Sequence, residues 1–140
     1  MKNNYFIILV FSIVLSACNT RSNFNDETKP NNWITLHSDS VNVVKLTDTL
    51  VIYSAVCRGC EYEKSTEFSI SDSLGIVELK SIETIDNNPS NMDGGSINKN
   101  LIIVPRKTGQ TMIKLYKFWN EPINAEDSAI FTTYIIEVKK

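Results

Sequence analysis

The sequence predicts an all-β domain, built as a sandwich or a barrel from about seven or eight short strands. Short runs of β-branched and aromatic residues recur along the chain at roughly even spacing. Turn signals rich in glycine, serine, asparagine and proline separate these runs, and no stretch shows a convincing helical period. We therefore expect a single domain made of strands.

The expected strands follow one another along the chain. Their positions are 33–37 (WITLH), 41–46 (VNVVKL), 47–56 (TDTLVIYSAV), two within 66–85 around the turn SDSLG, two within 100–119 around the hairpin turn RKTGQ, and 129–140. Tyr134, Ile136 and Val138 share one face of the last strand because side chains alternate along a strand. The polar run DNNPSNMDGGSINKN predicts one long loop, which is uncommon in a small domain and often functional.

The first residues have the layout of a secretory signal: one lysine, an apolar run and small residues before a cysteine. The apolar run from Tyr5 to Leu15 is shorter than the roughly 20 residues that span a bilayer. Leu15-Ser16-Ala17-Cys18 resembles the lipobox of bacterial lipoproteins. That resemblance implies a signal peptide over residues 1–17, cleavage before Cys18, lipidation of Cys18, and a lipid-anchored protein of the bacterial cell envelope. The alternative is an ordinary signal peptide with a chance cysteine.

The remainder divides into a polar, asparagine-rich tether at 18–32 and a folded domain at 33–140. The chain carries 14 basic and 16 acidic residues, for a net charge of −2 that becomes −3 when Lys2 leaves with the signal peptide. This balance is no footprint for nucleic acid, so we expect no nucleic-acid partner.

Cys57 and Cys60 form a C-x-x-C motif within VCRGCEYEK. Zinc requires four ligands, and the sequence offers no second cysteine pair and a single histidine. A redox dithiol begins a helix, whereas the flanks here read as strands, although a thiol redox protein stays open as a further alternative. We favour a small structural disulfide between the two, since a cysteine pair can oxidise beyond the cytoplasmic membrane.

No group of residues looks catalytic, so the sequence predicts a protein that is not an enzyme and needs no cofactor or metal. The set His37, Ser38 and Ser40 lacks the glycine pattern of a nucleophile elbow. The carboxylates Glu121, Glu126 and Asp127 are explained by a solvated loop.

What the domain offers is three loops, CRGCEY, NMDGGS and YKFWNEP. Their order and spacing over residues 41–140 resemble those of the chagasin-like inhibitors of papain-type cysteine peptidases. In that family, an Asn-Pro-Thr-Thr-Gly-aromatic loop, a glycine-rich loop and an Arg-Pro-Trp segment lie side by side. Gly59 and Tyr62 match the first loop, Gly94-Gly95 the second and Trp119 the third, while Lys117 and Phe118 replace the arginine and the proline.

The resemblance implies an immunoglobulin-like antiparallel β-sandwich that plugs the active-site cleft of a papain-like cysteine peptidase, and we expect a monomer. The residues that it assigns to the peptidase-binding loops are Cys57, Arg58, Gly59, Cys60, Tyr62, Asp93, Gly94, Gly95, Ser96, Lys117, Phe118 and Trp119. By itself Trp119 could equally end a strand as a core residue. The alternative function is a non-inhibitory immunoglobulin-like lipoprotein that binds another envelope protein or a glycan.

Overall fold

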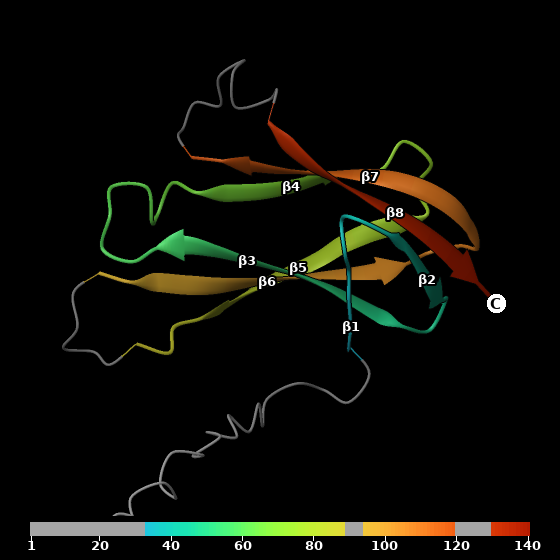
Figure 1. Ribbon diagram of the computed structural model, residues 1–140, viewed down its shortest axis with the longest axis horizontal. Coiled ribbons are helices and arrows are strands. Elements are labelled where there is room, and N and C mark those ends of the chain that lie inside the picture. The colour runs from blue at the N-terminus through green and yellow to red at the C-terminus, as the bar shows by residue number, and fades with distance from the viewer. Residues whose placement is uncertain (1–32, 89–93, 120–129) are drawn as a thin grey trace, which may run out of the picture.

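Eight strands make up the regular structure of the domain in the computed structural model, which describes residues 33–88, 94–119 and 130–140 (Figure 1). They are β1 (Trp33–Thr35), β2 (Val41–Lys45), β3 (Thr49–Cys57), β4 (Glu67–Ser71), β5 (Val77–Ile85), β6 (Ser96–Pro105), β7 (Gly109–Phe118) and β8 (Phe131–Lys139). The all-β prediction is confirmed. Since every regular element in the described ranges is a strand, none of them is a helix that could cross a membrane.

The strands form two four-stranded sheets that face each other as a sandwich, with strand orders β1-β3-β6-β5 and β2-β8-β7-β4 (Figure 1). The sandwich expected from the sequence is thus confirmed. Within the described strands, the inner pairings are antiparallel, whereas β1 lies parallel to β3 and β2 lies parallel to β8.

The two parallel pairs have one cause, the turn at residues 36–40 that carries the chain from the edge of one sheet to the edge of the other. Asn42 is buried in this crossing and ties it to β8. Its side chain accepts a hydrogen bond from the backbone N–H of His37 (2.8 Å) and donates to the carbonyls of His37 and Ile135 (2.9 Å each). His37, Ser38 and Ser40 are exposed in the same crossing.

The core lies between the sheets and follows the two-residue period of the strands. Leu50 and Ile52 of β3 pack with Leu101 and Ile103 of β6 and, across the sandwich, with side chains of the second sheet. The second sheet contributes Ile113, Leu115, Tyr134, Ile136 and Val138. The described residues of 33–140 therefore build both sheets and the interior that they share.

The strand register decides which loops are neighbours. Cys57, at the end of β3, pairs with Ser96, at the start of β6. Phe118, at the end of β7, pairs with Glu67, at the start of β4. The segments that follow β3, precede β6 and end β7 therefore lie at one end of the sandwich (Figure 1).

One expected boundary is wrong. Strand β6 begins at Ser96 rather than near Asn100, so the end of the predicted long loop is a strand. The polar residues of SINKN hide the alternation, because Ile97 alone is strongly apolar there. Ile97 is buried and pairs with Val56 of β3, and this tertiary pairing extends the strand.

Candidate functional site

The first loop (residues 58–66) is a compact turn between β3 and β4. A disulfide joins Cys57 to Cys60, whose Cα atoms lie 5.8 Å apart, within the usual range for this bond. Glu63 closes the turn, since its carboxylate accepts a hydrogen bond from the N–H of Gly59 (2.5 Å) and its N–H donates to the carbonyl of Cys60 (3.2 Å). Gly59 has φ +73°, a conformation that side chains disfavour. The loop is thus held by its own contacts.

The structure describes the second loop from Gly94 onward, and it describes the chain before this loop as far as Asn88. The second loop is hydrogen-bonded to the first. The N–H of Arg58 donates to the carbonyl of Gly95 (3.1 Å). The guanidinium of Arg58 also forms an ion pair with Asp86, with Nε 2.9 Å from Oδ2. The backbone N–H of Asn88 donates the hydrogen bond that contributes most to lowering the pKa of Asp86 below its ordinary value. The side-chain amide of Asn88 and the guanidinium of Arg58 lower this pKa further, and a smaller desolvation opposes them. The two loops therefore form one hydrogen-bonded unit.

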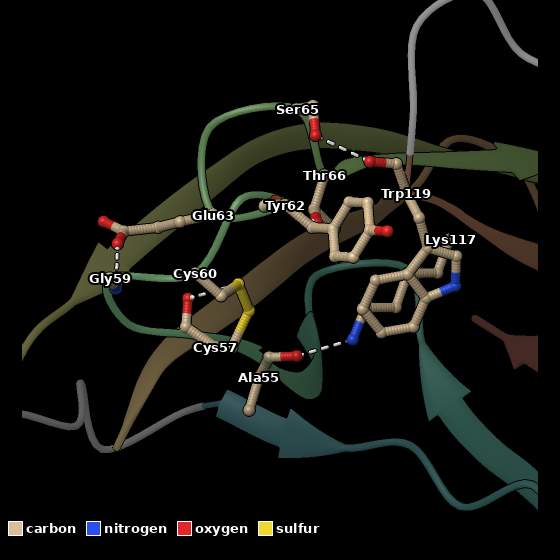
Figure 2. The surroundings of a disulfide bond; sticks show 10 residues. All are labelled: Ala55, Cys57, Gly59, Cys60, Tyr62, Glu63, Ser65, Thr66, Lys117 and Trp119. Atoms are coloured by element: carbon tan, nitrogen blue, oxygen red, sulfur yellow. Dashed lines mark hydrogen bonds between the residues drawn. A yellow bond between two sulfur atoms is a disulfide. The ribbon is translucent and has the colours of Figure 1, made fainter. Parts of the chain in front are cut away.

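The third segment (residues 117–119) contacts the first loop through Trp119 (Figure 2). The Tyr62 ring meets the indole edge to face, with centroids 6.5 Å apart and planes at 77°. Ser65 Oγ donates a hydrogen bond to the carbonyl of Trp119 at 2.6 Å. Tyr62 and Trp119 are about equally exposed, at 40% and 39%. Trp119 is therefore no core residue; it presents part of its ring to solvent from a fixed backbone position.

Lys117 links the two sheets beneath this aromatic pair (Figure 2). Its Nζ donates a hydrogen bond to the carbonyl of Ala55 on β3 (2.6 Å) and lies 4.1 Å from the centroid of the Trp119 ring. Burial lowers the pKa of Lys117. Lys117 thus supports Trp119 from below, with a cation over the ring.

Phe118 is turned the other way, as the alternation of side chains along β7 requires. Its ring stacks on Tyr116, with centroids 5.8 Å apart, and Tyr116 in turn contacts Phe131 at 5.6 Å. Of the third-segment residues assigned by resemblance, Lys117 and Trp119 therefore join the first loop, while Phe118 belongs to an aromatic row on β7 and β8.

A groove opens beside Trp119 between the two sheets. Its cavity volume is about 290 Å³, and its lining includes Tyr53, Lys117, Trp119 and Phe131. The groove lies where the edge strands leave their neighbours uncovered. Strand β1 pairs with β3 only as far as Val51, and β2 pairs with β8 only from Ile135 onward. The volume falls just below the range typical of small-molecule sites.

Some of the candidate residues lie outside the described ranges: Cys18, Asp93, Glu121, Glu126 and Asp127. Among the residues that are described, no three or more His, Cys, Asp or Glu side chains gather closely enough to hold a metal ion.

Two residues of the site were missed by the sequence reasoning. Ser65 fixes the carbonyl of Trp119 from 54 positions away, and Asp86 pairs with Arg58 from 28 positions away. Both are polar residues in polar stretches of the sequence, and nothing in their local sequence distinguishes them from solvated loop residues.

Comparison with known proteins shows the fold. No protein-family model matches the chain, and no curated protein matches it either. Two solved structures are similar over 79% of this chain and 100% of their own: the cysteine protease inhibitor EhICP2 from Entamoeba histolytica (TM-score 0.52, 18% identity) and amebosin (TM-score 0.51, 16% identity). At these identities the likeness is one of architecture, an immunoglobulin-like β-sandwich.

Proposed function

We propose that this protein is not an enzyme but an inhibitor of papain-type cysteine peptidases, and that it plugs the active-site cleft with the three segments described above. One observation carries the proposal. The segments come from distant parts of the chain, yet they are joined at one end of the sandwich by the Arg58–Gly95 and Ser65–Trp119 hydrogen bonds. A sandwich with unrelated loops has no need for this arrangement.

The chemistry of the three segments suits a cleft that accepts extended backbone. Gly59 and Gly94 are exposed, and a Cβ added to either would meet no atom within 4 Å, so backbone can approach another surface closely there. Trp119 and Tyr62 present apolar area on fixed supports, which reduces the ordering cost of binding. A standard interface buries roughly 800 Å² per partner, and three short segments can supply that area.

The architecture supports the same conclusion. The solved structure of EhICP2 is described as that of a cysteine protease inhibitor, and it is similar over its whole length. The order of the loops in the sequence, matched by Gly59, Gly94-Gly95 and Trp119, also resembles that of the chagasin-like inhibitors.

Inhibition assays test the proposal. The chain from residue 19 onward, which contains every described residue, should inhibit at least one member of a panel of papain-like and streptopain-like peptidases at micromolar concentration or below. An uncleaved inhibitor band on a gel after the assay would show that the chain is not simply a competing substrate. No inhibition across the panel would overturn the proposal.

We further propose that the inhibitor acts as a monomer held in the bacterial cell envelope by lipid on Cys18. The lipobox Leu15-Ser16-Ala17-Cys18 supports this. Two or three acyl chains give stable anchoring where a single chain does not. Membrane fractionation of cells that express the wild type or Cys18→Ala should find the wild type in the membrane pellet and the variant released. Equal pelleting of both would contradict the anchor.

The groove beside Trp119 favours a second candidate, a non-inhibitory module that binds an envelope protein or a glycan. Its aromatic lining by Tyr53, Trp119 and Phe131 is of the kind that captures apolar surface. Pull-down from the producing cell separates the two, because the inhibitor recovers a peptidase and the binding module recovers an envelope component.

A further inference from the structure

The disulfide of the first loop lies at the end of the sandwich where the three segments of the proposed plug meet. Cys57 ends β3, and Cys60 lies in the loop on the far side of the exposed Gly59. Both cysteines are only half-buried, and the exposed aromatic rings of Tyr62 and Trp119 belong to the same end of the sandwich (Figure 2). A docked loop would therefore carry the disulfide towards the cleft.

Papain-type peptidases keep their catalytic cysteine as a thiolate, the form that attacks disulfides. We infer that the Cys57–Cys60 disulfide is a covalent trap for the catalytic thiolate of the target peptidase. This inference rests on the proposed function, because only a plug in the cleft brings the two sulfur chemistries together.

The step is thiol–disulfide exchange. The peptidase thiolate attacks Sγ of Cys60, a bond forms between these two sulfurs, and the Cys57–Cys60 bond breaks with its electron pair passing to Sγ of Cys57. The peptidase cysteine is oxidised to a mixed disulfide, and Cys57 is reduced to a thiolate that can take a proton from water. No outside oxidant or reductant is needed.

The surroundings of the two sulfurs favour this direction of attack. Cys57 is held in β3 by its pairing with Ser96, whereas Cys60 belongs to the loop that follows the positive-φ Gly59. Attack at Cys60 leaves the displaced sulfur on Cys57, the residue that the strand pairing holds in place.

The reaction is also reversible. The freed thiolate of Cys57 stays three positions from Cys60, and it can attack the mixed disulfide to restore the loop and release the peptidase. The trap therefore prolongs the complex without consuming the inhibitor. Reductant would convert it to a purely non-covalent plug.

The experiment mixes the oxidised chain from residue 19 onward with an activated, desalted papain-type peptidase, quenches with acid and N-ethylmaleimide, and examines the mixture by non-reducing gel and mass spectrometry. We expect a one-to-one adduct that dithiothreitol removes and that peptide mapping assigns to Cys60. It should form ~100-fold faster than the adduct with glutathione at equal thiolate concentration, because docking supplies a high effective concentration.

Matched variants separate the possible outcomes. The Cys57→Ser, Cys60→Ser double variant should form no adduct, and Trp119→Ala, which leaves the disulfide intact, should slow adduct formation with the peptidase and leave the glutathione reaction unchanged. Inhibition by the wild type with no adduct would overturn the trap while the plug stands. No inhibition and no adduct would overturn the proposed function itself.

Two further results would also count against the inference. A reaction with glutathione as fast as that with the peptidase would mean a general redox disulfide rather than a trap. An adduct through Cys57 would overturn the choice of Cys60 as the attacked sulfur. A peptidase whose catalytic cysteine is alkylated should bind and form no adduct.

Discussion

Replacing Trp119 by alanine should weaken inhibition of a papain-type peptidase by about 60-fold. Trp119 is 39% exposed, which for a tryptophan of about 250 Å² leaves roughly 100 Å² to be buried on a partner. At about 25 cal/mol per Å² this area corresponds to about 2.5 kcal/mol of binding free energy. A loss of that size is typical of a binding hot spot.

The assay is the inhibition constant measured by titration against one peptidase, alongside the free energy of unfolding from urea denaturation. The free energy of unfolding should fall by up to about 4 kcal/mol, because the roughly 150 Å² of Trp119 that is already buried within the inhibitor is lost as well. Trp33→Ala is the matched control, since Trp33 pairs with Thr49 at the opposite end of β3 and should leave the inhibition constant unchanged. A change below threefold for Trp119→Ala, or an equal loss in both variants, would refute the reasoning.

Three other predictions concern the scaffold. Burial tends to raise the pKa of Asp72, but hydrogen bonds from Thr111 and three backbone N–H groups outweigh burial and lower the pKa below 3.8. The Asp72 carboxylate therefore stabilises the fold above about pH 4, and this contribution is lost as the pH falls through the lower pKa of the folded state. Asp72→Asn should therefore flatten the acid limb of a plot of unfolding free energy against pH. Gly95→Ala should lower the free energy of unfolding by about 1–2 kcal/mol, because φ is +89° there and the added Cβ comes 3.3 Å from a side-chain oxygen. Lys117→Met should lower it by about 1 kcal/mol through loss of the hydrogen bond to Ala55, and near-ultraviolet circular dichroism should report a change around Trp119.

Each of these has a control in the chain. Asp72 lies at the end of the sandwich away from the loops, so Asp72→Asn should not alter inhibition at neutral pH. Gly59→Ala meets no atom within 4 Å and should cost less than Gly95→Ala despite a similar φ of +73°. Lys114→Met removes a cation 4.2 Å from the Phe131 ring and should leave the Trp119 signal unchanged. A steep acid limb in Asp72→Asn, equal costs for the two glycines, or equal spectra for the two lysine variants would contradict the respective reasoning.

Much of the fold could be predicted because its cause is local. The alternation that puts Ile113 and Leu115 on one face of a strand can be read from consecutive residues. The turn around Gly109 follows from a backbone conformation that glycine tolerates. These features need no knowledge of distant residues. The start of β6 was misplaced because its stabilising partner, Val56, lies 41 positions earlier along the chain than Ile97.

The sequence by itself determined the strands, the turns and the residue types of the three loops. Only the tertiary structure decided that Trp119 is partly exposed and not a core residue, that Lys117 lies beneath it, and that Phe118 faces away. The physical reason is distance along the chain. The hydrogen bond from Ser65 to Trp119 spans 54 positions, and the hydrogen bond from Lys117 to Ala55 spans 62. These contacts fix the positions of Trp119 and Lys117, and they form only when β3 and β7 end at the same end of the sandwich.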